Sequence, residues 1–247
     1  MRFVVLLVGF GPSMLNVLDS AVPIACWSCS VGHVDSTLFC PHCSKIQPPP
    51  GGDYYRVFGL ERRFQIDLDA LEREFHRLSR KLHPDRFARA EEIEKQWSLA
   101  DTALLNDAYR TLKDALHRTE YLLKLEGAEI GEEHAGKDRK GQTDPSRVPE
   151  DLLEEVFDLN MQLEEMRMAR KMGAEDPALQ ASLEEAKKKF DGLLADVDRD
   201  LRVQWKVWDE SDRSTRPAAE KRMVALLDRR RYLSNLVRDV TETLGVK

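Results

Sequence analysis

Residues 71–85 read Leu71-Glu72-Arg73-Glu74-Phe75-His76-Arg77-Leu78-Ser79-Arg80-Lys81-Leu82-His83-Pro84-Asp85. Apolar residues recur here at spacings of four, three and four positions, which is the period of a buried helical stripe. They are Leu71, Phe75, Leu78 and Leu82. Pro84 lacks a backbone N–H and disfavours helical geometry in the residue before it. The stretch therefore predicts a helix that starts near Asp67 or Asp69, both suitable N-caps, and ends at the tripeptide.

A second amphipathic stretch runs from about residue 90 to residue 114. Its apolar row consists of Trp97, Leu104 or Leu105, Ala108 and Leu112. Two consecutive helices joined by a short turn lie antiparallel, so His83-Pro84-Asp85 is expected on an exposed turn between them. Shorter helices are expected at residues 54–60 and 119–127.

Composition limits the class of protein. Charged residues make up 33% of the 247-residue chain, aromatic residues only 7%, and most apolar residues recur at helical spacing. This favours a mostly α protein with one large domain or two to three small ones. The net charge of −6 argues against a nucleic-acid-binding protein as a whole, because such proteins carry an excess of basic residues. A local basic patch is still compatible with this net charge.

Residues 1–24 form a leader with a basic residue at position 2 and a short apolar core. The core is too short to span a membrane, and no membrane partner is expected. Four interpretations stay open: a secretory signal, a weak organelle-targeting segment, a disordered leader, or a translated upstream region. None of these belongs to the fold.

All four cysteines lie in residues 25–47, as two Cys-x-x-Cys pairs that precede a Pro/Gly-rich linker. Each pair can form a tight knuckle whose backbone N–H groups face the thiolates, and two such knuckles supply the four soft ligands that suit a structural zinc site. Zinc is therefore the expected cofactor, held by Cys26, Cys29, Cys40 and Cys43. Two disulfides are the alternative if the leader exports the protein, and a redox-active pair is a third interpretation.

Residues 149–247 are predicted to form three antiparallel helices, each with one apolar stripe and each preceded or opened by proline. The stripes consist of Leu152, Val156, Leu159, Leu163 and Met166; of Leu179, Leu183, Ala186, Phe190, Leu193, Val197, Leu201, Trp205 and Trp208; and of Met223, Leu226, Leu233, Val237, Val240 and Leu244. Arg230 falls in the last stripe and must snorkel or pair. Residues 134–145, which lack apolar periodicity, are expected to form a loop.

The tripeptide admits more than one function. A histidine two residues from an aspartate can act as an acid–base pair, but no nucleophile motif, phosphate loop or carboxylate-metal cluster accompanies His83 and Asp85, so no catalytic site is expected. A simple capped turn is the plainest alternative. Cations at positions 73, 77, 80 and 81 lie away from the apolar stripe. They either steer an acidic partner surface toward the turn or form an ordinary solvated face.

Residues 53–114 resemble a J-domain. The resemblance rests on the tripeptide, on Asp53-Tyr54-Tyr55 upstream and on Asn106-Asp107-Ala108-Tyr109-Arg110-Thr111-Leu112 downstream. J-domains stimulate ATP hydrolysis by DnaK-type chaperones. The resemblance implies a domain at residues 53–132 in which His83, Pro84 and Asp85 contact the ATPase domain of the chaperone and its linker. It also implies electrostatic docking by Arg73, Arg77, Arg80, Lys81 and Arg86.

The layout of the chain resembles the HscB family, called Jac in yeast, of iron–sulfur cluster co-chaperones. The J-domain-like region continues through residues 117–127 into an all-α region, without a Gly/Phe-rich stretch, and the tetracysteine segment is similar to that of animal HscB. The resemblance implies two partners, a DnaK/HscA-type chaperone and an IscU-like iron–sulfur scaffold protein, in the cytoplasm or, in a eukaryote, the mitochondrial matrix. Two questions stay open: whether the chaperone is dedicated or general, and whether the protein forms a homodimer.

The first C-terminal helix carries a second apolar row, Leu153, Phe157 and Met161, bordered by Glu154, Asp158 and Glu165. A three-helix bundle needs one stripe per helix, so an acid-edged second row favours a protein-docking surface, with packing against the J-domain as the alternative. In HscB the matching face contacts the scaffold together with an aromatic residue of the last helix, which corresponds to Tyr232. The resemblance departs at Leu152-Leu153-Glu154-Glu155, where HscB proteins often have Phe-Leu-Met-Glu.

The sequence thus predicts a mostly α protein with a small zinc-knuckle segment, a helical-hairpin J-domain and a C-terminal three-helix bundle. Its expected role is that of a co-chaperone. A J-protein with an unrelated client is one alternative. A zinc-dependent nucleic-acid-binding module with a degenerate J-domain is another, but Lys45 is the only lysine or arginine between residues 20 and 52.

Overall fold

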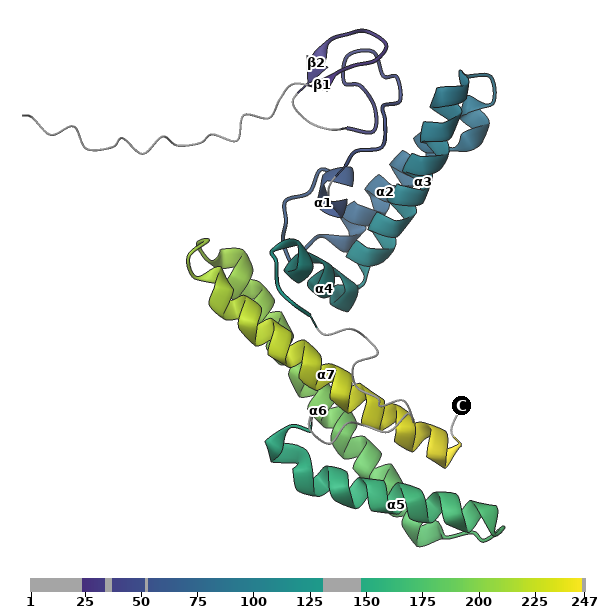
Figure 1. Ribbon diagram of the computed structural model, residues 1–247, viewed down its shortest axis with the longest axis vertical. Helices are drawn as coiled ribbons and strands as arrows, with labels where there is room; N and C mark the ends of the chain where they lie inside the picture. The colour runs from purple at the N-terminus through teal and green to yellow at the C-terminus, as the bar shows by residue number, and fades with distance from the viewer. Residues whose placement is uncertain (1–23, 34–36, 52, 131–147, 246–247) are drawn as a thin grey trace, which may run out of the picture. The chain divides into compact units, whose positions relative to one another are not determined.

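The computed structural model describes residues 24–33, 37–51, 53–130 and 148–245 (Figure 1). The expected leader at residues 1–24 falls almost entirely outside the described residues, and the expected loop at residues 134–145 falls entirely outside them. Among the described residues, no helix combines the length and apolar character needed to cross a membrane.

The protein is mostly α-helical, as the sequence predicts. Its elements are β1 (Ile24–Ala25), β2 (Gly32–His33), α1 (Tyr54–Val57), α2 (Leu68–Leu82), the 3-10 helix η1 (Pro84–Phe87), α3 (Glu92–Lys113), α4 (Ala115–Leu125), the 3-10 helix η3 (Glu150–Leu152), α5 (Leu153–Lys171), α6 (Pro177–Glu210) and α7 (Arg216–Leu244). The two short strands pair antiparallel, with Ile24 opposite His33.

Aspartate side chains cap several of these helices. Asp67 accepts a hydrogen bond from the Ala70 N–H at 2.9 Å, which confirms the expected start of α2. Asp114 accepts bonds from the N–H groups of residues 116 and 117, at 2.9 and 2.8 Å. This cap starts α4 at Ala115, four residues earlier than the sequence predicts, because it begins a new helix directly after α3 ends.

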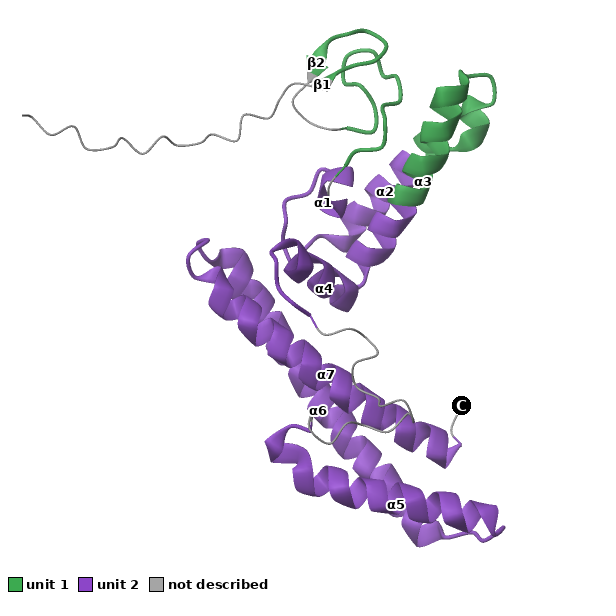
Figure 2. Cartoon of the chain, in the orientation of Figure 1, with its two compact units in different colours: residues 1–52, 79–104 green, residues 53–78, 105–247 purple. Residues whose placement is uncertain are grey.

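The chain divides into two compact units that do not follow chain order (Figure 2). Unit 1 comprises residues 1–52 and 79–104, and unit 2 comprises residues 53–78 and 105–247. The cysteine segment therefore groups with the end of the helical hairpin that carries the tripeptide. The other end of the hairpin groups with the C-terminal helices.

Helix α2 buries the row expected of it, and α3 does so only in its second half. Leu71, Leu78 and Leu82 of α2 are buried, and Phe75 is half-buried, its ring stacked on Tyr109 of α3 with centroids 4.1 Å apart. The row of α3 differs from the prediction in its first half. The buried residues there are Glu94, Ser98 and Asp101, followed by Leu105, Ala108 and Leu112, whereas Trp97 is half-buried.

Helices α5, α6 and α7 pack on one another as the predicted three-helix bundle. The stripe expected for α5 is buried at every position, and the α6 stripe is buried except at two half-buried positions. In α7, residues 226, 237 and 244 are half-buried, while Leu227, Tyr232 and Leu236 take buried places. Arg230 pairs with Asp198 of α6 at 2.6 Å, as its position in the stripe requires.

A buried joint in unit 2 connects the loop before α2 with the end of α6. The Phe64 ring is 1% exposed and packs edge-on against Trp208, with centroids 5.0 Å apart. Asp209 accepts hydrogen bonds from the N–H groups of Phe64 and Gln65, both at 2.9 Å. Arg118 of α4 donates to the Phe64 carbonyl at 2.8 Å. The J-domain-like part of unit 2 is thus in direct contact with the bundle.

Candidate functional site

The His83-Pro84-Asp85 tripeptide forms an exposed turn after α2. His83 has the extended ψ of 127° that a following proline favours, and it caps η1. The His83 Nδ1 accepts from the Asp85 N–H at 3.3 Å and lies 3.6 Å from the Asp85 carboxylate. The side chains of His83 and Asp85 are 58% and 90% exposed. Both are therefore available to a partner.

The start of this turn is anchored to α3 through the Leu82 carbonyl. Ser98 donates to this carbonyl from its hydroxyl at 2.6 Å, and Thr102 does so at 3.4 Å. Ser98 is fully buried. The last residue of α2 is thus held by a polar contact that hydrophobic periodicity does not reveal.

The five cations expected beside the turn are all exposed: Arg73, Arg77, Arg80, Lys81 and Arg86. Arg73, Arg77 and Arg80 lie on the side of α2 away from its buried row, and Lys81 lies at the flank of that row. Arg77 is paired with Glu74 one turn earlier, and the Lys81 Nζ lies 5.8 Å from the centroid of the Phe39 ring. The structure therefore offers a basic helix face that runs up to the turn.

The four cysteines come together in unit 1. They are free thiols, and their Sγ atoms all lie within 4.8 Å of one another. The Sγ atoms of Cys26 and Cys43 are 3.7 Å apart, and those of Cys29 and Cys40 are 3.8 Å apart. Close pairs thus join cysteines of different knuckles. One four-sulfur cluster of this kind is compatible with a metal site and does not match the alternative of two disulfides.

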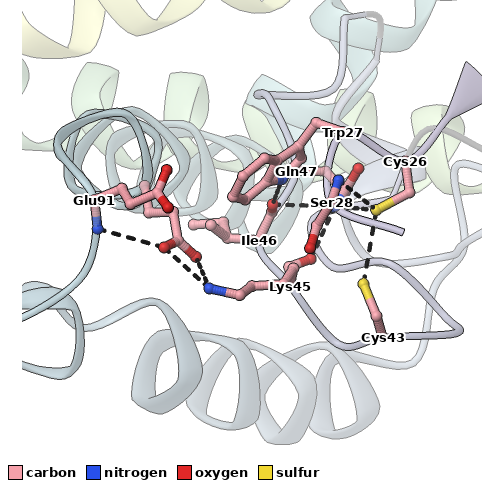
Figure 3. A network of polar contacts seen from close by, with 9 residues as sticks. Cys26, Trp27, Ser28, Cys43, Lys45, Ile46, Gln47 and Glu91 are labelled. Atoms are coloured by element: carbon pink, nitrogen blue, oxygen red, sulfur yellow. Dashed lines mark hydrogen bonds and ion pairs between the residues drawn. The ribbon is translucent and has the colours of Figure 1, made fainter. Parts of the chain in front are cut away.

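The two knuckles are built alike. In each, the residue after the second cysteine, Ser30 or Ser44, has a positive φ near 60° and donates its N–H to the carbonyl of the first cysteine at 2.9 Å. The N–H two residues after the first cysteine points at its sulfur, at 3.4 Å in both knuckles. A side-chain amide, Gln47 Nε2, is a further donor to the Cys26 sulfur, at 3.4 Å (Figure 3). These donors favour thiolates.

The short distances between the four thiols shift the pKa values of Cys26 and Cys29 in opposite directions. Burial by itself raises the pKa of the Cys26 thiol, but hydrogen bonds from the backbone of Cys29 and Ser28 outweigh it and lower that pKa to about 6. A backbone hydrogen bond from Val31 lowers the pKa of Cys29, but burial and the three neighbouring thiols raise it to about 12. A divalent cation held by Cys26, Cys29, Cys40 and Cys43 would stabilise all four sulfurs as thiolates.

Helix α5 presents the second apolar row to solvent. Leu153, Phe157 and Met161 are 51%, 65% and 60% exposed, which excludes burial of this row against the J-domain-like region. Glu154, Asp158 and Glu165 beside them are also exposed. Two residues that the sequence interpretation missed, Met168 and Met172, continue the row and are 59% and 78% exposed. The exposed apolar row therefore extends along the whole helix.

Tyr232 does not join this row. Its side chain is buried, 7% exposed, and burial raises its pKa to about 12. Its hydroxyl has no hydrogen-bond partner among the described residues. The structure thus places Tyr232 in the interior of the bundle, apart from the other residues expected to bind a scaffold.

The sequence interpretation also missed the contacts between the cysteine segment and α3. Lys45 forms an ion pair with the buried Glu94 at 2.9 Å, and Trp27 packs edge-on against Trp97 with ring centroids 5.5 Å apart. The tryptophan between the two cysteines of the first knuckle is a sequence signal for such a contact, since a large apolar ring on a small module commonly packs on a neighbour.

Known proteins with related sequences share these regions. Residues 53–121 match the family model of the DnaJ domain. The chain is 37% identical over 144 residues to the mouse "Iron-sulfur cluster co-chaperone protein HscB", covering 56% of each protein. It spans about half the length of the eukaryotic relatives that it matches.

A bacterial relative is matched over nearly its whole length. The chain is 34% identical over 165 residues to the "Co-chaperone protein HscB homolog" of Aeromonas hydrophila, covering 60% of this chain and 95% of that protein. The fold of this chain is similar to that in the crystal structure of human co-chaperone protein HscB, with a TM-score of 0.62 and 26% identity. The match covers 89% of this chain and 98% of the human one. The chain therefore belongs to the HscB family.

Proposed function

We propose that this protein is a co-chaperone of iron–sulfur cluster assembly that stimulates the ATPase of a DnaK/HscA-type chaperone. The observation that carries the proposal is the exposed tripeptide turn at the end of a basic helix, inside the region that matches the DnaJ domain. The printed name of the mouse relative, an iron–sulfur cluster co-chaperone, supports the same role. The partner is either a dedicated or a general chaperone, in the cytoplasm or the mitochondrial matrix.

The basic face and the turn have different tasks in this proposal. Exposed arginines and lysines attract an acidic surface over several ångströms and raise the rate of encounter, but their contribution is weakened by salt. His83 and Asp85 then make short-range contacts, since both side chains are mostly exposed and their backbone is fixed by η1.

The variant His83→Gln tests this function. We expect the ATPase rate of the chaperone at saturating co-chaperone to fall to near its unstimulated value, with the helical content of the variant unchanged, because the side chain is exposed. Arg199→Gln, on an exposed surface of α6, is the control. Full stimulation by His83→Gln would show that the turn does not activate the chaperone.

The proposed second partner is an IscU-like iron–sulfur scaffold protein, bound by the exposed apolar row of α5. Five apolar side chains on about a third of the helix circumference, bordered by acids, form a surface that a monomeric protein has little other reason to expose. Glu154, Asp158 and Glu165 would supply polar and charged contacts at its edge. Tyr232, which is buried, would then act only through the packing of the bundle.

Zinc is the proposed metal. A tetrahedral site with Zn–S bonds of about 2.3 Å has sulfur–sulfur edges of about 3.8 Å. The two close sulfur pairs, at 3.7 and 3.8 Å, fit that geometry. Cys26, Cys29, Cys40 and Cys43 would hold the ion, which would stabilise the module without taking part in a reaction.

Elemental analysis tests the metal. We expect about one zinc per chain in the purified protein and none in the Cys26→Ser, Cys29→Ser double variant, because two of four ligands are lost. The helical signal of the double variant should be close to that of the unmodified protein, since the helices have their own buried rows. Native protein with disulfides and no metal would refute the zinc site.

A further inference from the structure

The cysteine module, defined as residues 24–33 and 37–51, packs against the arm of the hairpin that carries the tripeptide. Both belong to unit 1. Its contacts fall on the two helices that flank the turn, near the end of α2 and near the start of α3. The module is thus placed where it can influence residues 83–91.

The contact with α3 centres on a buried charge. The Glu94 side chain is only 4% exposed, and both of its carboxylate oxygens accept from Lys45 Nζ, at 2.9 and 3.1 Å. The Glu91 N–H adds a weaker donor at 3.4 Å (Figure 3). No other hydrogen bond to this carboxylate is found in the part of the chain that the structure describes. A buried carboxylate without its cation is strongly destabilised, so Glu94 depends on Lys45.

Lys45 in turn depends on the fold of the second knuckle. It follows Cys43 by two residues, and its carbonyl accepts the Cys40 N–H at 2.8 Å. Its Nζ also lies 5.7 Å from the centroid of the Trp27 ring. The ring of Trp27, inside the first knuckle, is fixed by a 2.6 Å bond from its Nε1 to the Ile46 carbonyl. Both knuckles therefore contribute to the position of the ammonium group.

The Lys45–Glu94 ion pair is linked to the tripeptide turn through the buried face of α3. Ser98 lies one helical turn after Glu94 and is equally buried, and it donates to the carbonyl of Leu82, the residue before the tripeptide. On the other helix, Lys81 lies over the Phe39 ring of the module. The module thus contacts the hairpin on both sides of the turn.

We propose that the metal-loaded cysteine module holds the tripeptide turn in place, with Lys45 as its positioning residue. The role of the turn in engaging a chaperone rests on the proposed function. The stabilisation of the start of α3 by the module, which we call bracing, does not rest on that function, because it concerns contacts within this chain. Metal binding in the module then supports the presentation of a turn that contains none of the ligands.

The variant Lys45→Met tests, in the full-length protein, whether the module stabilises the start of α3 through Lys45. Its zinc content should equal that of the unmodified protein, because no ligand is changed. Amide hydrogen exchange in residues 92–98 should be accelerated at least about threefold, because the first turn of α3 opens more often without its cation. Lys45→Arg, which keeps the charge, should restore slow exchange. Lys124→Met, an exposed position on α4, is the matched control.

A second readout separates positioning from mere stability. The concentration of Lys45→Met needed for half-maximal stimulation of the chaperone ATPase should rise about three- to tenfold, while the maximal rate is retained, because His83 and Asp85 are intact but less well placed. Zinc removal by a chelator should reproduce both effects.

The proposal is overturned by unchanged exchange in residues 92–98 of Lys45→Met, or by faster exchange with an unchanged half-maximal concentration. Loss of zinc from Lys45→Met would also overturn the assignment to this residue. If the unmodified protein stimulates no chaperone, the proposed function fails, and hydrogen exchange alone still decides whether the module braces α3.

Discussion

Asp101 is a fully buried carboxyl group in α3, and neither of its oxygens has a hydrogen-bond partner among the described residues. Burial raises its pKa to about 7, because a desolvated carboxylate is disfavoured. The pKa in the folded state thus lies above the value of about 3.9 in an unfolded chain. Between these two values the folded state binds the additional proton, so the free energy of unfolding falls as the pH rises through this window.

The variant Asp101→Asn should remove this pH dependence. We expect its stability advantage over the unmodified protein to be about 1–3 kcal/mol larger at pH 8 than at pH 5, since most of the window between the two pKa values lies between these two pH values. Urea denaturation at both pH values measures this. The control is Asp107→Asn, an exposed position of the same helix. Equal stability differences at pH 5 and pH 8 would show that Asp101 does not titrate as its burial implies.

At the scale of elements, α5 is the helix with two apolar faces. One face packs in the bundle, where Val156, Leu159 and Leu163 are buried. The other face is exposed and extends from Leu153 to Met172. Substitutions on the second face should therefore affect binding far more than folding, whereas substitutions on the first should unfold the bundle.

The triple variant Leu153→Ala, Phe157→Ala, Met161→Ala should bind the scaffold protein about two to four decades more weakly, because each side chain contributes on the order of 1–2 kcal/mol if it docks. Its thermal stability should be close to that of the unmodified protein, and stimulation of the chaperone without client should persist. Calorimetric titration measures the affinity.

The control for the triple variant is Val203→Ala with Val207→Ala, which removes apolar surface of similar exposure from α6. Normal scaffold binding by the triple variant would contradict the docking role of α5. An unfolded triple variant would instead show that the row belongs to a core.

At the scale of the whole molecule, the joint around Phe64 couples the J-domain-like region of unit 2 to the bundle. Asp209 is half-buried, and burial raises its pKa although the N–H groups of Gln65 and Phe64 oppose the shift. Its carboxylate is the only acceptor among the described residues for these two neighbouring N–H groups. Together with the Phe64–Trp208 ring contact, it joins the two regions, so we expect them to unfold as one cooperative unit.

The variant Asp209→Ala should destabilise this joint by about 1–3 kcal/mol, because two backbone donors lose their partner. We expect urea denaturation, followed by tryptophan fluorescence and by circular dichroism, to change from coincident to separate transitions. Asp196→Asn, in an exposed ion pair on the same helix, should have little effect. Coincident transitions with unchanged midpoints in Asp209→Ala would contradict a structural role for the joint.

Local patterns account for what was predicted correctly from the sequence. The rows of α2, α5 and α6 follow a helical period, and the ends of the helices follow aspartate and proline, whose effects reach only a few residues. The cysteine cluster follows from the spacing within each pair. The fold class and the metal-compatible site therefore needed no tertiary information. The functional roles of the turn, the basic face and the α5 row stay predictions.

The amino-acid sequence by itself determined the helices, the buried stripes of α2, α5 and α6 and the two Cys-x-x-Cys knuckles, because each depends on residues that are close together in the chain. Only the tertiary structure decided that Tyr232 is buried, that α5 exposes its second row and that Glu94 is covered by Lys45. Lys45 and Glu94 are 49 residues apart in the chain. Contacts over such separations leave no periodic trace, because they depend on how complete elements pack, and this is also why the two compact units do not follow chain order.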